Sequence, residues 1–234
     1  LSRHLAPIGL FAVLLACALD VQGKTREDCE KSYKPQSGEH GKDVIWVPTT
    51  DTLVTRMLVM GKVTASDRVL DLGAGDGKIA IAAEKEFGAT AVGIEYEPEM
   101  AKFAQCMVEV AGVQNKVKII QGDIFQEDFT SATVLTLYLL PELNLRLRPK
   151  ILDMKPGTRV VSHSFTMDDW EPDADLSISE GSAYLWIVPA KVGGDWTFRA
   201  REGNGGSFPV TLQQTYQKLQ GTSGGQEIKD AKLN

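Results

Sequence analysis

Five short runs of mainly aliphatic and β-branched residues alternate with helical segments through the middle of this chain, and no other feature constrains its fold as much. The runs cover residues 68–72, 90–95, 117–121, 133–138 and 158–162. Helical segments follow the first two runs, at residues 78–87 and 98–111. Strands that alternate with helices pair in parallel and are covered on both faces. The sequence therefore predicts an α/β fold built on a mostly parallel sheet.

The flanks of this region differ in pattern. Apolar spacing predicts a helix over residues 52–60 with Asp51 as its cap. Residues 184–189 and 196–199, joined by a Gly-Gly turn, predict a closing antiparallel hairpin. Residues 200–234 alternate apolar and polar positions between glycine-rich turns and predict a β-rich extension, with a further strand expected beyond Asn234.

Length and charge limit the kind of protein and of partner. The chain has 234 residues, which leaves room for one large domain or for one medium domain with appendages. Its 31 acidic residues exceed its 25 lysines and arginines, so the net charge is −6. Nucleic-acid backbones require clustered positive charge. A protein or small-molecule partner is therefore expected, and nucleic acid is not.

The N-terminal segment, residues 1–23, has the layout of a secretory signal peptide. Two basic residues precede an apolar run at 5–19, and Gly23 lies near the expected cut. The run is shorter than the ~20 residues of a membrane span. An uncleaved anchor, a lipidated Cys17 and a buried helix stay as alternatives. We expect an exported or periplasmic protein, and this segment is the candidate for an association with the membrane.

Residues 24–44 are charged and contain proline and glycine, so they predict a linker or poorly ordered arm. Cys29 lies in this arm and Cys106 in a predicted helix. We expect two unpaired or buried thiols, although an oxidising compartment would permit them to pair. No spacing of metal ligands is present, and no metal site is predicted.

The tip of the first predicted strand carries glycines and carboxylates together. Gly73 and Gly75 let the backbone turn sharply toward a ligand, and Asp71 and Asp76 flank them. A nicotinamide dinucleotide site is disfavoured, because Lys78 stands where the third glycine of its motif belongs and because the two acids would face a pyrophosphate. The pair of acids suits a cationic ligand.

The next two strand tips also end in acids. Glu95 can accept both hydroxyls of a ribose. Asp123 can accept from an adenine amine, and Ile124 can pack on the ring. Carboxyl ends of parallel strands share one edge of a sheet. The ordered set predicts one site for a cationic ligand that bears an adenosine.

These residues resemble the class I S-adenosylmethionine-dependent methyltransferases over residues 45–199. Asp71, Gly73, Gly75 and Asp76 match the first motif of that family, Glu95 its ribose-binding acid and Asp123 its adenine-side acid. The resemblance implies S-adenosyl-L-methionine as cofactor. It also implies a Rossmann-like sheet of seven strands, mostly parallel, with an antiparallel final hairpin and helices on both faces.

A narrower likeness rests on three segments, residues 46–49, 137–141 and 160–165. They resemble an exported bacterial group related to the mitochondrial carrier-protein lysine methyltransferases. The resemblance implies that Thr49 faces the methionine end of the cofactor. At the fourth strand tip, Thr136-Leu-Tyr-Leu-Leu-Pro141 departs from the Asn/Asp-Pro-Pro-Tyr/Phe motif of enzymes that methylate bases. Tyr138 is the candidate catalytic residue there.

Other polar residues near these segments are not predicted to take part in catalysis. His163 is expected to form a structural hydrogen bond and not to relay protons. Glu142 and Asn144 are expected to be solvated. The chain is thus predicted to be an enzyme that transfers the sulfonium methyl in line to a nucleophile, with protein lysine nitrogen as the leading acceptor. A small-molecule N-, O- or S-methyltransferase and a non-catalytic cofactor-binding module are the alternatives.

Overall fold

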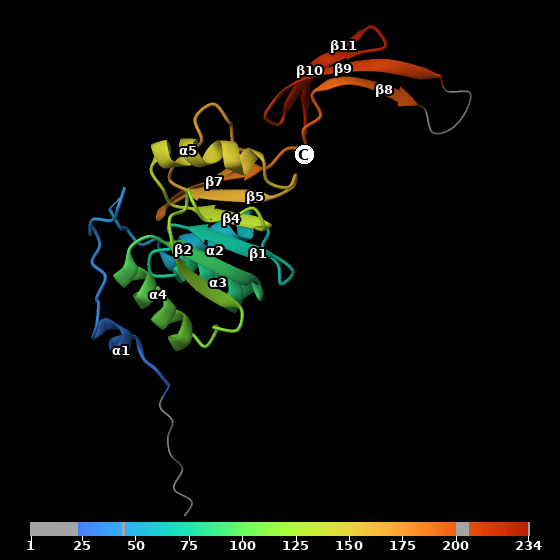
Figure 1. Cartoon of the computed structure of the whole chain (residues 1–234). Helices are drawn as coiled ribbons and strands as arrows, with labels where there is room; N and C mark the ends of the chain where they lie inside the picture. The colour runs from blue at the N-terminus through green and yellow to red at the C-terminus, as the bar shows by residue number, and fades with distance from the viewer. Residues whose placement is uncertain (1–22, 44, 200–205, 234) are drawn as a thin grey trace, which may run out of the picture.

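The computed structural model describes residues 23–43, 45–199 and 206–233, so the predicted signal segment lies outside the described residues. Two sheets organise the chain (Figure 1). The first has seven strands in the order β3-β2-β1-β4-β5-β7-β6. Its parallel strands are β1 (Arg68–Leu72), β2 (Thr90–Glu95), β3 (Val117–Gln121), β4 (Val134–Leu137) and β5 (Arg159–His163).

The last two strands of this sheet form its antiparallel hairpin. β7 (Gly181–Ile187) pairs antiparallel with both β5 and β6 (Ala174–Ile178). The predicted fold class is thereby confirmed, but the predicted partner of residues 184–189 is wrong. The segment at 196–199 belongs to β8 (Gly194–Arg199), which pairs with β9 (Ser207–Thr215) in the second sheet. β6 escaped prediction because ADLSI is a half-exposed edge strand with few β-branched residues.

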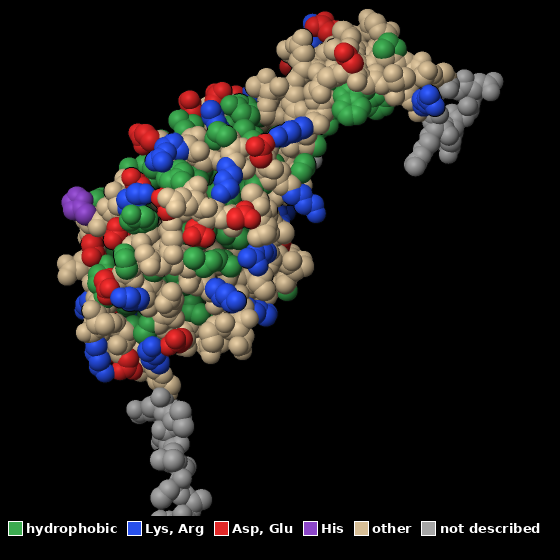
Figure 2. Space-filling model, in the orientation of Figure 1, with side chains coloured by type: hydrophobic (Ala, Val, Ile, Leu, Met, Phe, Trp, Pro, Cys, Tyr) green, Lys and Arg blue, Asp and Glu red, His purple; other side chains and the backbone are tan. Residues whose placement is uncertain are grey.

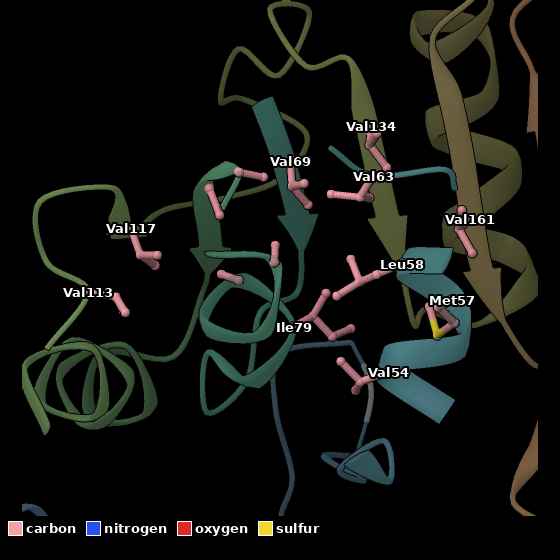
Figure 3. Close-up of a cluster of buried hydrophobic side chains, with 14 of the residues drawn as sticks. Val54, Met57, Leu58, Val63, Val69, Ile79, Val113, Val117, Val134 and Val161 are labelled. Carbon is pink, nitrogen blue, oxygen red and sulfur yellow. The ribbon is translucent and has the colours of Figure 1, made fainter. Parts of the chain in front are cut away.

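Helices cover both faces of the first sheet. One core cluster joins α2 (Asp51–Met60), α3 (Lys78–Phe87) and α4 (Pro98–Val110) to one face. Figure 3 shows Met57 and Leu58 of α2 turned toward the valines of β1, β4 and β5. The second cluster joins α5 (Pro141–Leu152) to the other face, because alternate strand residues such as Leu70 and Leu72 point that way.

The structure corrects two predictions about the helices. Thr50, not Asp51, is the N-cap of α2, since its hydroxyl accepts from the Leu53 amide. Asn144 is fully buried, so the expectation of a solvated side chain is wrong. It lies at helical spacing from Leu147 and Ile151, on the buried stripe of α5. Its amide donates to Ser162 Oγ and to the Thr166 carbonyl.

The second sheet has the order β11-β10-β9-β8, where β10 is Lys218–Ser223 and β11 is Gln226–Lys232. It projects beyond the first sheet as a β-rich C-terminal extension (Figure 1). Gln217 fastens it to the larger domain, because its amide accepts from the Trp170 indole and donates to the Glu171 carbonyl. β8 belongs to this extension, so the change of sheet falls between Ile187 and Gly194.

Charges of both signs are interspersed over the face shown in Figure 2. Within the part of the chain that the structure describes, no helix is both long and apolar enough to cross a bilayer.

Candidate functional site

A cavity of about 920 Å³ lies at the carboxyl ends of the parallel strands. All nine residues that the sequence predicts for cofactor binding or catalysis line this cavity, although the role of each stays a prediction. They are Thr49, Asp71, Gly73, Gly75, Asp76, Glu95, Asp123, Ile124 and Tyr138. Eight of them lie at or just after the carboxyl ends of parallel strands, which terminate at the same edge of the sheet, and Thr49 reaches this edge from the segment before α2.

The glycine loop between β1 and α3 is shaped by close contacts. Gly73 and Gly75 have φ of 77° and 54°, the left-handed region that glycine occupies without strain. A Cβ on Gly75 would lie 2.5 Å from the Trp46 indole nitrogen. A Cβ on Gly93 of β2 would lie 2.7 Å from the Ala74 Cβ. The loop therefore has room only for glycine where it meets its neighbours.

Asp71 is buried at the end of β1, where it has a hydroxyl partner but no cationic one among the described residues. Thr136 Oγ1 donates to its Oδ1 at 2.7 Å. Burial, together with the nearby Asp76 and Glu95 carboxylates, raises the pKa of Asp71 to about 7, although the bond from Thr136 opposes the increase. Lys78 is directed elsewhere, to Asp51 and to the Thr49 carbonyl. The Asp71 carboxylate is therefore available to an external cation.

Glu95 lies at the tip of β2 and already holds the loop. Its Oε2 accepts from the Gly75 amide at 2.8 Å and its Oε1 accepts from the Glu97 amide at 2.9 Å. Burial raises the pKa of Glu95, and these amide bonds oppose the increase. Each carboxylate oxygen keeps a second lone pair for a hydroxyl donor. Burial also raises the pKa of Asp76.

Asp123 at the tip of β3 differs from the other acids because it has a cationic partner. Lys42 Nζ lies 2.9 Å from its Oδ2 and 4.5 Å from the centre of the Tyr96 ring. The Lys42 bond, followed by the Phe125 amide, lowers the pKa of Asp123. Sequence reasoning missed Lys42, since nothing local ties a lysine in the arm to a strand tip 81 residues later.

The opposite end of the cavity, beside β4 and β5, is aromatic. The Tyr138 ring lies 3.8 Å from that of His163 and 6.3 Å from that of Phe165, measured between centroids. Thr49 Oγ1 and His163 Nδ1 are hydrogen-bonded at 3.0 Å. Burial lowers the pKa of His163 to about 4, so the ring is neutral at physiological pH. The predicted structural hydrogen bond of His163 is confirmed.

Comparison with known proteins identifies relatives of this chain. Residues 71–174 match the model of the ANTKMT methyltransferase domain. A protein-lysine N-methyltransferase of Saccharolobus islandicus is 40% identical over 151 residues, which are 62% of this chain and 94% of that protein. This chain belongs to that family of S-adenosylmethionine-dependent methyltransferases.

Two further proteins are similar to this methyltransferase. A mouse adenine nucleotide translocase lysine N-methyltransferase is 28% identical over 120 residues, covering 51% of this chain and 52% of the mouse one. A crystal structure of an RNA methyltransferase from Salinibacter ruber with S-adenosyl-L-homocysteine is 44% identical. It covers 62% of this chain and 96% of that one, with a TM-score of 0.61.

The cavity fits S-adenosyl-L-methionine, which is the cofactor of this family. The cofactor carries a sulfonium and an ammonium group. The buried Asp71 and the partly buried Asp76 offer negative charge, and neither has a lysine or arginine within salt-bridge reach among the described residues. When bound, it supplies an electrophilic methyl group. The residues predicted for this cofactor line the cavity at positions where Asp71 and Asp76 would hold its cationic methionine end, Glu95 its ribose, and Ile124 would pack on its adenine.

The raised pKa of Asp71 predicts that cofactor affinity depends on pH. A carboxyl that titrates near 7 is mostly protonated at pH 6, and a protonated Asp71 does not attract the ammonium group. We expect S-adenosylhomocysteine to bind about tenfold more weakly at pH 6 than at pH 8. Calorimetry in buffers of different ionisation enthalpy should also detect proton release on binding near pH 7. An Asp71→Asn variant should lose this dependence, and an equally steep profile in the variant would contradict the assignment.

Proposed function

We propose that this methyltransferase methylates the side-chain nitrogen of lysine in proteins. The observation that carries the proposal is the aromatic wall beside β4 and β5, where Tyr138 and Phe165 line the cavity. Aromatic faces attract positive charge, which develops on the neutral lysine nitrogen as that nitrogen takes the methyl group. The Saccharolobus relative, aligned over 94% of its length, bears the name of the same activity.

Protonation decides how a lysine would react here. Free lysine has a pKa near 10.4 and must lose its proton before its nitrogen can attack. Transfer into a cavity walled by Tyr138, Leu139 and Phe165 disfavours the charged form, so the proton leaves to water on entry. His163 is neutral and does not repel the incoming ammonium. Positioning then accounts for catalysis, because the sulfonium is already a good leaving group.

An RNA acceptor is the second candidate, favoured by the 44% identity to the Salinibacter structure. The charge of this chain supports a protein instead. The net charge is −6, and the face in Figure 2 intersperses both signs without a basic stripe. RNA recognition uses concentrated positive charge and stacking surfaces. A small-molecule acceptor is the remaining alternative.

A labelling experiment separates these acceptors. The protein is incubated with methyl-tritiated S-adenosylmethionine and a cell-envelope extract, and label is counted in protein, RNA and small-molecule fractions. We expect label in protein, recovered as methyl-lysine after hydrolysis. An Asp71→Ala variant gives the background. Label confined to RNA or to small molecules would reject the lysine proposal.

Tyr138 is proposed to act through its ring and not through its hydroxyl. We expect Tyr138→Phe to keep kcat within about threefold, because the ring remains. Tyr138→Ala should lower kcat about tenfold, as expected for a desolvated cation–π contact of ~1–2 kcal/mol. Steady-state kinetics on the labelled acceptor measure this, and calorimetry checks that cofactor affinity is retained. A large loss in the phenylalanine variant would point instead to a role for the hydroxyl.

We also propose that the enzyme acts outside the cytoplasm, with possible membrane association through its N-terminal segment. The signal-like residues 1–23 support this. The Cys29–Cys106 disulfide supports it too, because such bonds persist in oxidising compartments. Fractionation of the native host, with mass spectrometry of the mature N-terminus, is the test. A cytoplasmic protein that retains residues 5–19 would refute the proposal.

A further inference from the structure

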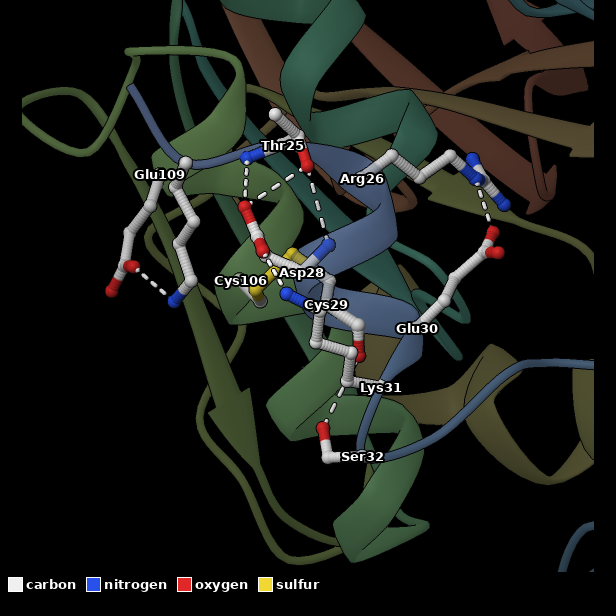
Figure 4. The surroundings of a disulfide bond; sticks show 10 residues. Thr25, Arg26, Asp28, Cys29, Glu30, Lys31, Ser32, Cys106 and Glu109 are labelled. Carbon is white, nitrogen blue, oxygen red and sulfur yellow. Dashed lines mark hydrogen bonds and ion pairs between the residues drawn. A yellow bond between two sulfur atoms is a disulfide. The ribbon is translucent and has the colours of Figure 1, made fainter. Parts of the chain in front are cut away.

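The arm before the first sheet is attached to the domain and is not a free linker. Its helix α1 (Arg26–Glu30) packs on α4, and Cys29 forms a disulfide with Cys106 of α4 (Figure 4). The expectation of unpaired thiols is therefore wrong. The signal was missed because 77 residues separate the two cysteines and no pattern links them.

After α1 the arm folds into a compact turn. The Gly38 amide donates to the Trp46 carbonyl, and the Trp46 amide donates to the Glu39 carbonyl, each at 2.8 Å. The Tyr33 hydroxyl donates to Glu39 Oε2 at 2.6 Å. Burial is the largest cause of the raised pKa of Tyr33, and the hydrogen bond to Glu39 raises this pKa further. These bonds let the segment act as a wall and not as a loose strand.

This wall faces the cofactor cavity directly. Tyr33, Glu39, Lys42 and Trp46 line the cavity together with Asp123. Trp46 closes over the glycine loop, as its contact with Gly75 shows. Lys42 reaches Asp123 at the adenine end of the site. The arm thus contacts both the first and the third of the strand tips that hold the cofactor.

The disulfide is the strongest attachment at the other end of the arm. Other contacts at this end of the arm are an exposed ion pair between Lys24 and Glu109, the Arg26 guanidinium over the Phe103 ring, and an edge contact between the rings of Tyr33 and Phe103. Exposed pairs contribute little. Cys106 lies on α4, the helix that follows Glu95 directly. The disulfide therefore couples the arm to the helix beside Glu95, the predicted ribose-binding residue.

We infer that the described residues of 33–46 form one wall of the cofactor cavity and contact the bound cofactor. We further infer that the Cys29–Cys106 disulfide holds this wall in place. The family model matches from residue 71 onward, and the Saccharolobus alignment uses 94% of that protein but 62% of this chain. The wall is therefore outside the segment matched by the family model. Breaking the disulfide lets the wall leave the cavity and weakens cofactor binding.

The test compares oxidised and reduced full-length protein. Dithiothreitol transfers two electrons and two protons to the Cys29–Cys106 bond, which gives two thiols and the cyclic disulfide of the reagent. We expect the Kd of S-adenosylhomocysteine to rise about tenfold, which corresponds to a wall in place about a tenth of the time. Calorimetry measures the Kd, thiol titration confirms reduction, and hydrogen exchange follows the Gly38 and Trp46 amides.

Two variants control the experiment. A Cys29→Ser, Cys106→Ser protein should bind as weakly as the reduced protein and should not respond to dithiothreitol. Lys24→Ala removes another contact between arm and α4 outside the cavity and should change the Kd less than twofold. An unchanged Kd in fully reduced protein would overturn the inference. So would a weaker Kd with unchanged exchange of the two amides, since the disulfide would then act elsewhere.

Discussion

Replacing Asp71 by alanine is expected to weaken S-adenosylhomocysteine binding about 100-fold. The carboxylate is 2% exposed and its partner in the described structure is the Thr136 hydroxyl, so an ammonium group would meet it away from water. A buried, hydrogen-bonded charge pair broken on one side costs ~3 kcal/mol or more, which is two decades of affinity. Calorimetric titration at pH 8 measures the loss.

Asp71→Asn separates charge from shape. The amide keeps an acceptor for Thr136 but has no negative charge, so binding should weaken nearly as much. The cofactor-free variant should be more stable than the parent above pH 7. The folded pKa of Asp71 lies above its unfolded value near 3.8, so the cost of burying the charge grows as pH rises from about 4 to about 7. Thermal unfolding at pH 5 and pH 8 tests this.

The control for Asp71 is Asp175→Ala, which removes an exposed aspartate from the edge strand β6. It should change neither affinity nor stability appreciably. If Asp71→Ala bound the cofactor with parental affinity, the assignment of the cationic end of the site to β1 would be wrong.

Replacing Asp67 by alanine is expected to lower the free energy of unfolding by about 3–5 kcal/mol. Asp67 precedes β1 at the end of the sheet opposite the cavity and is buried. It accepts from Arg159 and from Thr133 Oγ1, and its other oxygen accepts from the Thr64 amide and hydroxyl. Its removal leaves the Arg159 guanidinium largely enclosed without a counter-charge. Chemical denaturation followed by circular dichroism measures the loss.

The same carboxylate predicts sensitivity to acid. Burial raises the pKa of Asp67, but the bonds from Arg159, Thr133 and Thr64 outweigh burial and bring it to about 2. Because the folded pKa is below the unfolded one, this stabilisation is complete above about pH 4 and is lost as pH falls toward 2. The alanine variant should therefore differ less from the parent at pH 2 than at pH 7.

Asp153→Ala is the matched control, since it breaks an ion pair with Lys191 whose side chains are 70% and 73% exposed. Exposed pairs contribute about 0–1 kcal/mol. A similar loss in both variants would mean that the Asp67 network has no special role. Cofactor affinity should stay within twofold in the Asp67 variant at temperatures where it is folded, because the network lies away from the cavity.

Local pattern was sufficient for most of the sheet and for the strand tips. Short aliphatic runs indicate each of β1 to β5, and Asp71, Glu95 and Asp123 end or follow three of them. The edge strand β6 carried no such signal. Its omission led to the wrong hairpin, since the predicted strand at 184–189 needed a partner and the nearest later predicted strand was at 196–199.

The sequence by itself determined the fold class, the cofactor class and the residues at the strand tips. It could do so because the period of apolar residues is local and because parallel strands end at one edge. The tertiary structure alone decided that Cys29 pairs with Cys106, that Lys42 meets Asp123 and that Asn144 is buried. These depend on segments distant in sequence that only the packed fold brings within bonding distance. The burial of Asp71 also became known only from the tertiary structure, since the sequence does not distinguish a desolvated aspartate from an exposed one.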